Sequence, residues 1–116
     1  MTLRVLVVDD NTDNADLLAE VLSSGGHDVR VAYDGTSALA RLGEAPSDVV
    51  FLDIGLPDMS GYDVASKIRV QFGANVRLVA LTGFSGREAR DRATDAGFDA
   101  FVGKPFAVAD VLKALG

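Results

Sequence analysis

Short apolar runs rich in β-branched residues alternate with helix-length segments along this chain. Two of the runs, Val5-Leu6-Val7-Val8 and Val49-Val50-Phe51-Leu52, contain no polar residue, and three further runs lie at about 29–31, 78–81 and 100–102. Each run is followed by a segment long enough to form a helix. This alternation is typical of a parallel sheet with helices packed on both faces. The chain is therefore predicted to have an α/β fold.

The composition of the strands indicates their places in the sheet. Val29-Arg30-Val31 alternates apolar with charged residues and suits an edge, whereas the first and third runs are apolar throughout and suit the centre. For five strands we expect the flavodoxin-like order 2-1-3-4-5. The expected architecture is a flavodoxin-like (βα)5 three-layer sandwich with a parallel five-stranded sheet in the middle.

Length and composition narrow the class of protein. The 116 residues suit one domain, residues 1–116, with a real hydrophobic core but no room for a second one. The absence of cysteine excludes disulfides, thiolate metal sites and thiol nucleophiles, and the net charge of −6 disfavours direct nucleic-acid binding. No apolar stretch is long enough to span a membrane, and Met1-Thr2-Leu3-Arg4 has no signal-peptide layout, so we expect cytoplasmic localisation.

Capping residues and apolar spacing predict where the helices lie. The helices are expected from Asn11 to Gly25-Gly26, over about Thr36 to Leu42, from Ser60 onward, over about Gly86 to Ala96 and over Ala107 to Leu115. The fourth helix offers only alanines to the core and should be the least firmly held. The last helix has an apolar stripe that should face the core, formed by Val108, Val111, Leu112 and Leu115.

Polar residues follow four of the predicted strands at their carboxyl ends. Asp9-Asp10 follow the first strand, Asp53 the third, Thr82 the fourth and Lys104 the fifth. In an open parallel sheet, ligands bind beyond these ends where the winding direction reverses, here between the first and third strands. The carboxylates would thus crowd one crevice, which is tolerable mainly when a hard cation such as Mg²⁺ occupies it.

This set of groups suits phosphoryl transfer. A carboxylate beside Mg²⁺ can attack a phosphoryl group and form an acyl phosphate, while an ammonium stabilises charge on the transferring oxygens. Lys104 supplies that ammonium and Thr82 a hydroxyl. Each of these residues also has a simpler structural interpretation when it is considered alone. Asp10 could cap a helix, Lys104-Pro105 could form a surface loop, and Phe101 could belong to the hydrophobic core. Their coincidence at one crevice favours a shared function.

Other conspicuous side chains are expected to be structural. His27 follows a helix exit and should be exposed, and Lys67 and Arg69 should lie on the outer face of the third helix. We assign none of the three to the chemistry of the crevice.

Four segments match a known pattern in the right order: Val-Leu-Val-Val-Asp-Asp-Asn at 5–11, Leu-Asp-Ile-Gly-Leu-Pro-Asp-Met-Ser-Gly at 52–61, Leu-Thr-Gly at 81–83 and Phe-Val-Gly-Lys-Pro-Phe at 101–106. Together they resemble the receiver domain of two-component response regulators, over essentially the whole chain. The sequence around Asp53 also resembles that of the receiver domains of hybrid histidine kinases.

The resemblance implies an acceptor and a metal site. Asp53 would accept the phosphoryl group, and Asp10 would bind Mg²⁺ directly. Asp9 would act mainly through water on the ion, and the backbone carbonyl of Gly55 would complete the protein's ligands. Two positions depart from the commonest family pattern, because Gly55 and Phe84 lack a polar group able to position a hydrolytic water.

The resemblance also implies a two-state switch. Lys104 would contact the phosphate from a conformation fixed by a cis bond to Pro105. Thr82 would close onto the phosphate, and Phe101 would turn inward into the space that Thr82 leaves. Such a chain is a signalling receiver that assists its own phosphorylation and dephosphorylation, and not an enzyme in the usual sense.

Partners follow from the same resemblance. A histidine kinase or histidine phosphotransfer domain would donate the phosphoryl group, docking at the first helix. A downstream effector protein or domain would bind the face formed by the fourth helix, fifth strand and fifth helix. The chain would be a monomer or a weak dimer, with no direct contact with nucleic acid or membrane.

Three alternatives remain open at this point. A Mg²⁺-binding pseudo-receiver would keep the metal without accepting phosphate. An aspartyl-phosphate phosphohydrolase that uses Mg²⁺ would usually carry an Asp-x-Asp motif with its nucleophile at the first strand, whereas the two acids at that strand are adjacent here. A flavin-binding electron carrier would need a Ser/Thr/Gly-rich phosphate loop after that strand, where Asp9-Asp10-Asn11 would repel phosphate.

Overall fold

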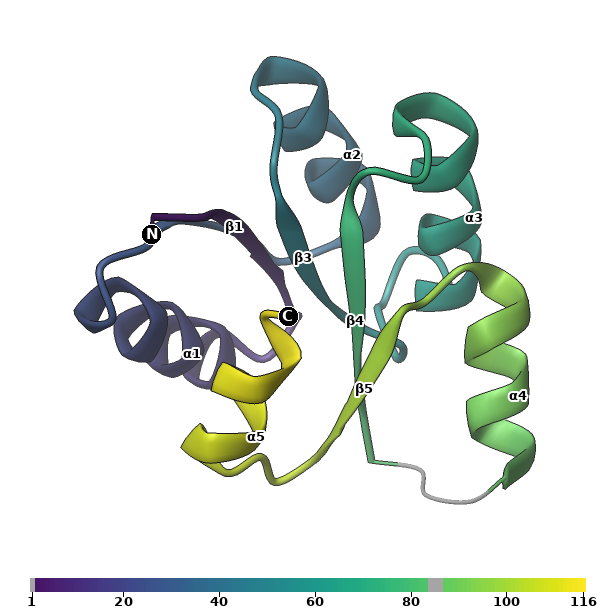
Figure 1. Cartoon of the computed structure of the whole chain (residues 1–116). Coiled ribbons are helices and arrows are strands. Elements are labelled where there is room, and N and C mark those ends of the chain that lie inside the picture. The colour runs from purple at the N-terminus through teal and green to yellow at the C-terminus, as the bar shows by residue number, and fades with distance from the viewer. Residues whose placement is uncertain (1, 84–86) are drawn as a thin grey trace.

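Strands and helices alternate in the computed structural model, which describes residues 2–83 and 87–116 (Figure 1). Phe84 and the expected helix start at Gly86 lie outside the described residues. In chain order the elements are β1 (Arg4–Val8), α1 (Thr12–Ser24), β2 (Asp28–Ala32), α2 (Gly35–Glu44), β3 (Val49–Asp53), α3 (Gly61–Phe72), β4 (Arg77–Thr82), α4 (Arg87–Ala96), β5 (Ala100–Gly103) and α5 (Val108–Ala114).

The five strands form one parallel sheet in the order β2-β1-β3-β4-β5. The predicted fold class and strand order are therefore confirmed, including the edge position of β2. The winding direction reverses between β1 and β3, since β1 pairs with β2 on one side and β3 on the other. In a doubly wound sheet this is the place where a ligand crevice opens.

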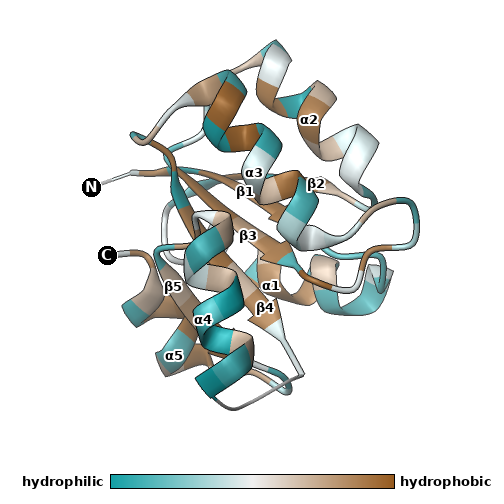
Figure 2. Ribbon diagram, turned by 90° about the vertical axis from the view of Figure 1, so that its right-hand side faces the viewer, coloured by the Kyte–Doolittle hydropathy of each residue, from teal (hydrophilic) through white to brown (hydrophobic). Residues whose placement is uncertain are grey.

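Alternate residues of the strands point to opposite faces of the sheet and build two cores. Leu6, Val50 and Leu78 pack beneath α2, α3 and α4, whereas their neighbours Val7 and Phe51 pack beneath α1 and α5. Figure 1 shows the two helix layers on either side of the sheet, and Figure 2 shows hydrophobic strands between them. Because β1 and β3 are buried on both faces, their ends are rigid supports for side chains.

Short polar residues begin α1 and α3, as predicted, whereas α5 begins after Ala107 without a side-chain cap. Oδ1 of Asn11 accepts a hydrogen bond of 3.1 Å from the backbone N–H of Asn14 at the start of α1. Oγ of Ser60 accepts one of 3.2 Å from the N–H of Tyr62 at the start of α3. Each contact satisfies a backbone donor that the first helical turn leaves without a partner.

The fourth helix has a weak apolar face, as its sequence indicates. Ala93 is its buried residue among those described, and most of its ribbon has the colours of hydrophilic residues in Figure 2. The guanidinium carbon of Arg92 lies 4.2 Å from the centre of the Tyr62 ring on α3. Arginine contacts thus supplement the small apolar contribution that α4 makes to the core.

The expectation of an outward-facing Arg69 was wrong. Its Nε and Nη2 donate to the carbonyl of Gly97 at 3.0 and 2.7 Å, and Nη2 also pairs with Oδ2 of Asp99 at 2.8 Å. Arg69 therefore ties α3 to the segment that follows α4. His27 is likewise half-buried rather than exposed, and its Nδ1 accepts from the N–H of Leu3 at 3.1 Å.

The apolar stripe of the last helix lies differently from the prediction. Val111 and Ala114 are the buried residues of α5, whereas Val108 is 53% exposed and Leu112 45% exposed. The small side chain of Ala114 was not counted in the predicted stripe. The helix turns the side that carries Val111 and Ala114 toward the sheet, and this rotation leaves Val108 and Leu112 near solvent.

Candidate functional site

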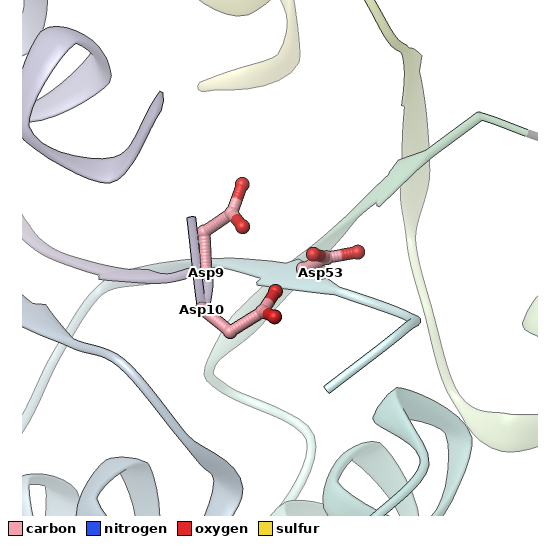
Figure 3. A group of neighbouring side chains, drawn as sticks. All are labelled: Asp9, Asp10 and Asp53. Atoms are coloured by element: carbon pink, nitrogen blue, oxygen red, sulfur yellow. The ribbon is translucent and has the colours of Figure 1, made fainter. Parts of the chain in front are cut away.

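The register of the sheet brings the acidic residues together. Val8 of β1 pairs with Leu52 of β3, so Asp9 and Asp53 occupy the next positions on neighbouring strands. Carboxylate oxygens of Asp9, Asp10 and Asp53 lie within 4.8 Å of one another. Figure 3 shows the three side chains beside one another at the strand ends. The three acids thus meet at the reversal between β1 and β3, where the sequence predicts a crevice.

Asp9 is the most buried acid of the cluster. Its side chain is 1% exposed, and Oδ1 accepts a hydrogen bond of 3.0 Å from the N–H of Asn11. Oδ2 faces Nζ of Lys104 at 3.1 Å, yet among the described residues it is a buried oxygen without a hydrogen bond of proper geometry. Burial raises the pKa of Asp9 above its ordinary value, and the nearby Asp53 adds to the rise. The contacts with Asn11 and Lys104 oppose this shift.

Asp53 is held by two donors. Its Oδ1 accepts a hydrogen bond of 3.0 Å from the N–H of Gly55, and Oδ2 lies 3.0 Å from Nζ of Lys104. Burial pushes the pKa of Asp53 upward, but the contacts with Lys104 and Gly55 outweigh it and bring the pKa below its ordinary value. Asp53 is therefore an ionised carboxylate at neutral pH, as a nucleophile must be.

Lys104 lies between the two buried carboxylates. Its backbone N–H donates to the carbonyl of Thr82 at 2.8 Å, which sets the start of the segment after β5, and the Lys104–Pro105 peptide bond is cis. Burial lowers the pKa of Lys104, but the contacts with Asp53 and Asp9 outweigh this effect and bring the pKa above its ordinary value. The ammonium is consequently charged at neutral pH.

Thr82 and Phe101 lie on the paired strands β4 and β5. Thr82 ends β4 and is 9% exposed, whereas Phe101 on β5 is half-buried. The guanidinium carbon of Arg90 is 5.9 Å from the centre of the Phe101 ring. A cavity of about 60 Å³ lies between α4 and the paired strands β4 and β5, and its lining includes Ile54, Thr82, Ala93 and Phe101. Both predicted switch residues therefore border the same space.

The chemistry of this cluster suits a divalent metal. The cluster contains three carboxylates, and the one ammonium at the cluster, that of Lys104, pairs with Asp9 and Asp53, so the described side chains leave an excess of negative charge. All the offered ligands are carboxylate oxygens, which Mg²⁺ prefers. The buried Oδ2 of Asp9 has no hydrogen bond of proper geometry among the described residues, and a bound metal or its water would supply a partner for it. The residues present thus fit a bound Mg²⁺.

One residue near the site was missed by sequence reasoning. Asp58, in the loop after β3, accepts hydrogen bonds from the start of α2, where Gly35 and Thr36 donate at 2.9 Å each. No local pattern reveals this contact, because its partners are more than 20 residues away in the sequence. The acid in Leu56-Pro57-Asp58 by itself is an ordinary loop residue.

Comparison with known proteins decides the family. The family model of the response regulator receiver domain matches residues 5–116, almost the whole chain. The chain belongs to this family. This receiver domain is part of two-component signalling rather than a classical enzyme, and the phosphohydrolase alternative is not favoured.

Relatives of the receiver domain include kinases and regulators. It is 37% identical over 111 residues to the sensor histidine kinase RcsC of Salmonella typhimurium, covering 96% of this chain and 12% of RcsC. It is 41% identical over 115 residues to the transcriptional regulatory protein KdpE of Mycobacterium tuberculosis, covering 99% of this chain and 50% of KdpE. The chain therefore spans half or less of the length of these curated relatives.

The fold of the receiver domain also has a solved counterpart. The chemotaxis protein CheY4 of Vibrio cholerae superimposes with a TM-score of 0.94 at 28% identity, covering 99% of this chain and 97% of CheY4. No helix in the described part of the receiver domain has both the length and the apolar character needed to cross a membrane.

Proposed function

We propose that Asp53 of this receiver domain accepts a phosphoryl group from a phosphohistidine of a partner protein. The observation that carries the proposal is the pairing of Asp53 with Lys104 at 3.0 Å, in a crevice that two further carboxylates share. This arrangement favours an ionised Asp53, and the ammonium of Lys104 would stabilise the charge that develops on the transferring oxygens.

The transfer step involves one carboxylate oxygen and one phosphorus atom. An oxygen of Asp53 attacks the phosphorus, forming an O–P bond as the N–P bond to the imidazole breaks. The leaving nitrogen keeps the electron pair of that bond. Lys104 remains positively charged throughout and contacts the transferring oxygens, while the backbone N–H of Gly55 orients the acceptor.

The proposed metal site consists of oxygen ligands from the ends of β1 and β3 and from the loop after β3. Asp10 and Asp53 would bind Mg²⁺ directly, Asp9 would act mainly through water, and the carbonyl of Gly55 would complete the set. When bound, the ion neutralises charge on the incoming phosphoryl group. The exposed position of Asp10 leaves its carboxylate accessible to a hydrated ion.

A groove beside Lys104 is the proposed docking place for the phosphohistidine partner. The groove has a volume of about 400 Å³ and is lined by Asn14 and Leu17 of α1 and by Lys104, Pro105 and Phe106. Leu17 is 53% exposed there, so it offers apolar area to a partner helix. Because Lys104 contacts Asp53 and also lines the groove, a partner bound there would present its imidazole near the acceptor.

The proposed response to phosphorylation involves Thr82, Phe101 and the face formed by α4, β5 and α5. The cavity that both side chains border gives Phe101 a place to turn into. The weak apolar face of α4 favours movement of that helix. A downstream effector would read the changed face.

Intact mass spectrometry tests the proposed function. The protein is incubated with Mg²⁺ and a small acyl-phosphate donor, beside an Asp53→Asn variant and a sample with the metal removed. We expect the wild type to gain one phosphoryl group and both controls to gain none. Phosphorylation that persists in Asp53→Asn would refute the assignment of the acceptor. No gain in the wild type, even from a phosphohistidine partner, would indicate a metal-binding pseudo-receiver.

A further inference from the structure

The loop between β3 and α3 is attached to the start of α2 by one carboxylate. Oδ1 of Asp58 accepts a hydrogen bond of 2.9 Å from the N–H of Gly35. Oδ2 accepts from the N–H of Thr36 at 2.9 Å and from its hydroxyl at 2.8 Å. Both oxygens of Asp58 are thus used, and both bind the first turn of a helix that is distant in the sequence.

A second carboxylate at the same helix start has no part in this attachment. Asp34 immediately precedes α2, and its Oδ1 accepts from the N–H of Ser37 at 2.7 Å. Asp34 and Asp58 therefore share the donors of one helical turn, as expected for anionic groups at a helix N-terminus. Asp34 caps the helix from its own segment, whereas Asp58 reaches it from the loop that follows Asp53.

The base of the same loop is closed by a backbone contact. The N–H of Gly61 donates to the carbonyl of Ile54 at 2.8 Å. A Cβ on Gly61 would lie 2.5 Å from the carbonyl oxygen of Asp53, so only glycine permits this close approach. Between this closed base and the attachment at Asp58 lies Gly55, whose N–H donates to Oδ1 of Asp53 at 3.0 Å.

Close packing at the other end of the attachment reinforces it. A Cβ on Gly35 would lie 2.5 Å from Cγ of Met59 and 2.8 Å from Cγ2 of Val64. The glycine at the first position of α2 therefore lets the loop approach the helix closely enough for Asp58 to reach both backbone donors. Geometry, rather than charge alone, fits Asp58 to this place.

We infer that Asp58 is a positioning residue for the metal site, because it holds the loop that carries Gly55 against α2. This inference rests on the proposed function, in which the carbonyl of Gly55 is a metal ligand. Asp58 is exposed and acts through the loop rather than by contact with the ion. Residues that orient metal ligands from outside the site commonly influence affinity because Mg²⁺ demands strict ligand geometry.

Calorimetric titration with Mg²⁺ tests the inference, with Asp34→Asn as the matched control. Both Asp58→Asn and Asp34→Asn remove one negative charge and one cap from the same end of α2. We expect Asp58→Asn to raise the Kd for Mg²⁺ by roughly tenfold, the lower end of the usual effect of losing such a partner. Asp34→Asn should change the Kd by less than about twofold, because screened charge away from the site has little effect.

A variant with one contact fewer adds a graded result. Thr36→Val removes the hydroxyl donor to Asp58 but keeps the backbone donor and the shape of the side chain. Its Kd should lie between those of the wild type and Asp58→Asn. Equal Kd values for the wild type and Asp58→Asn, or equal rises in Asp58→Asn and Asp34→Asn, would overturn the inference while leaving the proposed function intact.

Amide hydrogen exchange without metal measures the attachment itself. The N–H of Gly55 should exchange faster in Asp58→Asn than in the wild type and at an unchanged rate in Asp34→Asn. Unchanged exchange in Asp58→Asn would overturn the positioning role. If the wild type does not bind Mg²⁺ at all, the proposed metal site and the inference both fail, an outcome distinct from tight binding by all variants.

Discussion

The ammonium nitrogen of Lys104 lies 3.0 Å from Oδ2 of Asp53. The same nitrogen is 3.1 Å from Oδ2 of Asp9, so one cation bridges the acids at the ends of β1 and β3. In the absence of metal, this ammonium is the positive charge that compensates the acidic crevice most directly. Lys104 and a divalent cation consequently compete for the same carboxylates, although both favour an incoming phosphoryl group.

Replacing Lys104 should therefore strengthen metal binding while it weakens phosphorylation. For Lys104→Met we expect a Kd for Mg²⁺ lower by on the order of tenfold, since a positive charge beside the ion is removed at short range. Phosphorylation of Asp53 by an acyl-phosphate donor should become slower. Calorimetry gives the Kd and intact mass gives the rate. Lys113→Met, on the exposed side of α5, is the control, and weaker Mg²⁺ binding by Lys104→Met would contradict this account.

Removing one acid from the cluster should change stability in opposite directions with and without metal. Asp10→Asn relieves repulsion among the three carboxylates, so we expect a higher Tm than the wild type when no metal is present. With Mg²⁺ at about 100 times the wild-type Kd, the wild type gains about 2.7 kcal/mol and should become the more stable protein.

Thermal unfolding with and without Mg²⁺ checks this crossover. Asp13→Asn is the matched control, because Asp13 lies in the first turn of α1, where a negative charge is favourable. That variant should lower the Tm in both conditions. A Tm for metal-free Asp10→Asn below that of the wild type would show that repulsion in the cluster does not limit stability.

The sequence indicates the acidic crevice because strand ends are local features. Asp9, Asp53 and Lys104 each follow an apolar run, and a parallel sheet brings such ends to one edge whatever the details of packing. The contacts of Asp58 and Arg69 cannot be predicted in this way. Gly35 and Thr36, the partners of Asp58, and Gly97 and Asp99, which Arg69 contacts, lie 22 to 30 residues away along the chain. The spacing of apolar residues does not predict which distant segment a carboxylate or guanidinium will contact. Contacts of this kind depend on the packed arrangement of whole elements.

The side of α5 that faces the sheet also could not be predicted from the sequence. Helical spacing identifies a stripe but not its centre when a small residue such as Ala114 can replace a larger one at the contact. Val108 and Leu112 therefore lie nearer to solvent than Val111 and Ala114, although both belong to the predicted stripe. Arg92 shows the converse, because a residue of a charged helix forms a specific contact with an aromatic ring.

The contact between Arg92 and Tyr62 should stabilise α4 measurably. A double-mutant cycle with Arg92→Ala and Tyr62→Leu isolates the contact, and we expect a coupling free energy of about 0.5–1 kcal/mol. Amide exchange in α4 should become faster in Arg92→Ala, while exchange in β1 and β3 stays unchanged. Arg87→Ala, at the first position of α4, is the comparison on the same helix. A coupling free energy of zero would mean that the stacked geometry does not stabilise the fold.

Two glycine substitutions should have opposite effects on the free energy of unfolding. A Cβ on Gly61 would meet backbone atoms of Asp53 and Ile54 at 2.5 Å, so Gly61→Ala should destabilise the protein by about 1–3 kcal/mol. Apart from its chain neighbours and the backbone of its own helix, no atom of the described residues would lie within 4 Å of a Cβ on Gly43, near the end of α2. Gly43→Ala should stabilise the protein by about 0.5–1 kcal/mol, through the greater helix propensity of alanine.

Urea unfolding of both variants gives the two free energies. Because Gly61 also supports the backbone of Asp53, Gly61→Ala should in addition slow phosphorylation, whereas Gly43→Ala should leave the rate unchanged. Equal stability of Gly61→Ala and the wild type would show that the loop base can relax around a methyl group.

Low pH should reduce the free energy of unfolding, partly because Asp58 becomes protonated. The hydrogen bonds from Gly35 and Thr36 lower the pKa of Asp58 from an ordinary value of 3.8 to about 2. A carboxyl with a lowered pKa in the folded state stabilises the fold above its unfolded pKa, and this contribution disappears as the pH falls through the folded pKa. The free energy of unfolding should therefore fall between about pH 4 and pH 2, and fall less steeply in Asp58→Asn.

Urea unfolding at several pH values within this window provides the comparison. A residual slope should remain in Asp58→Asn, because Arg4 lowers the pKa of Asp48 through a hydrogen bond and titration of Asp48 weakens the fold in the same direction. Asp48→Asn should remove part of that remaining slope, and the double variant should be the flattest of the four proteins. Parallel curves for the wild type and Asp58→Asn would mean that the helix donors bind the protonated and ionised carboxyl equally well. The attachment of the loop would then persist in acid, since its strength would not depend on the charge of Asp58.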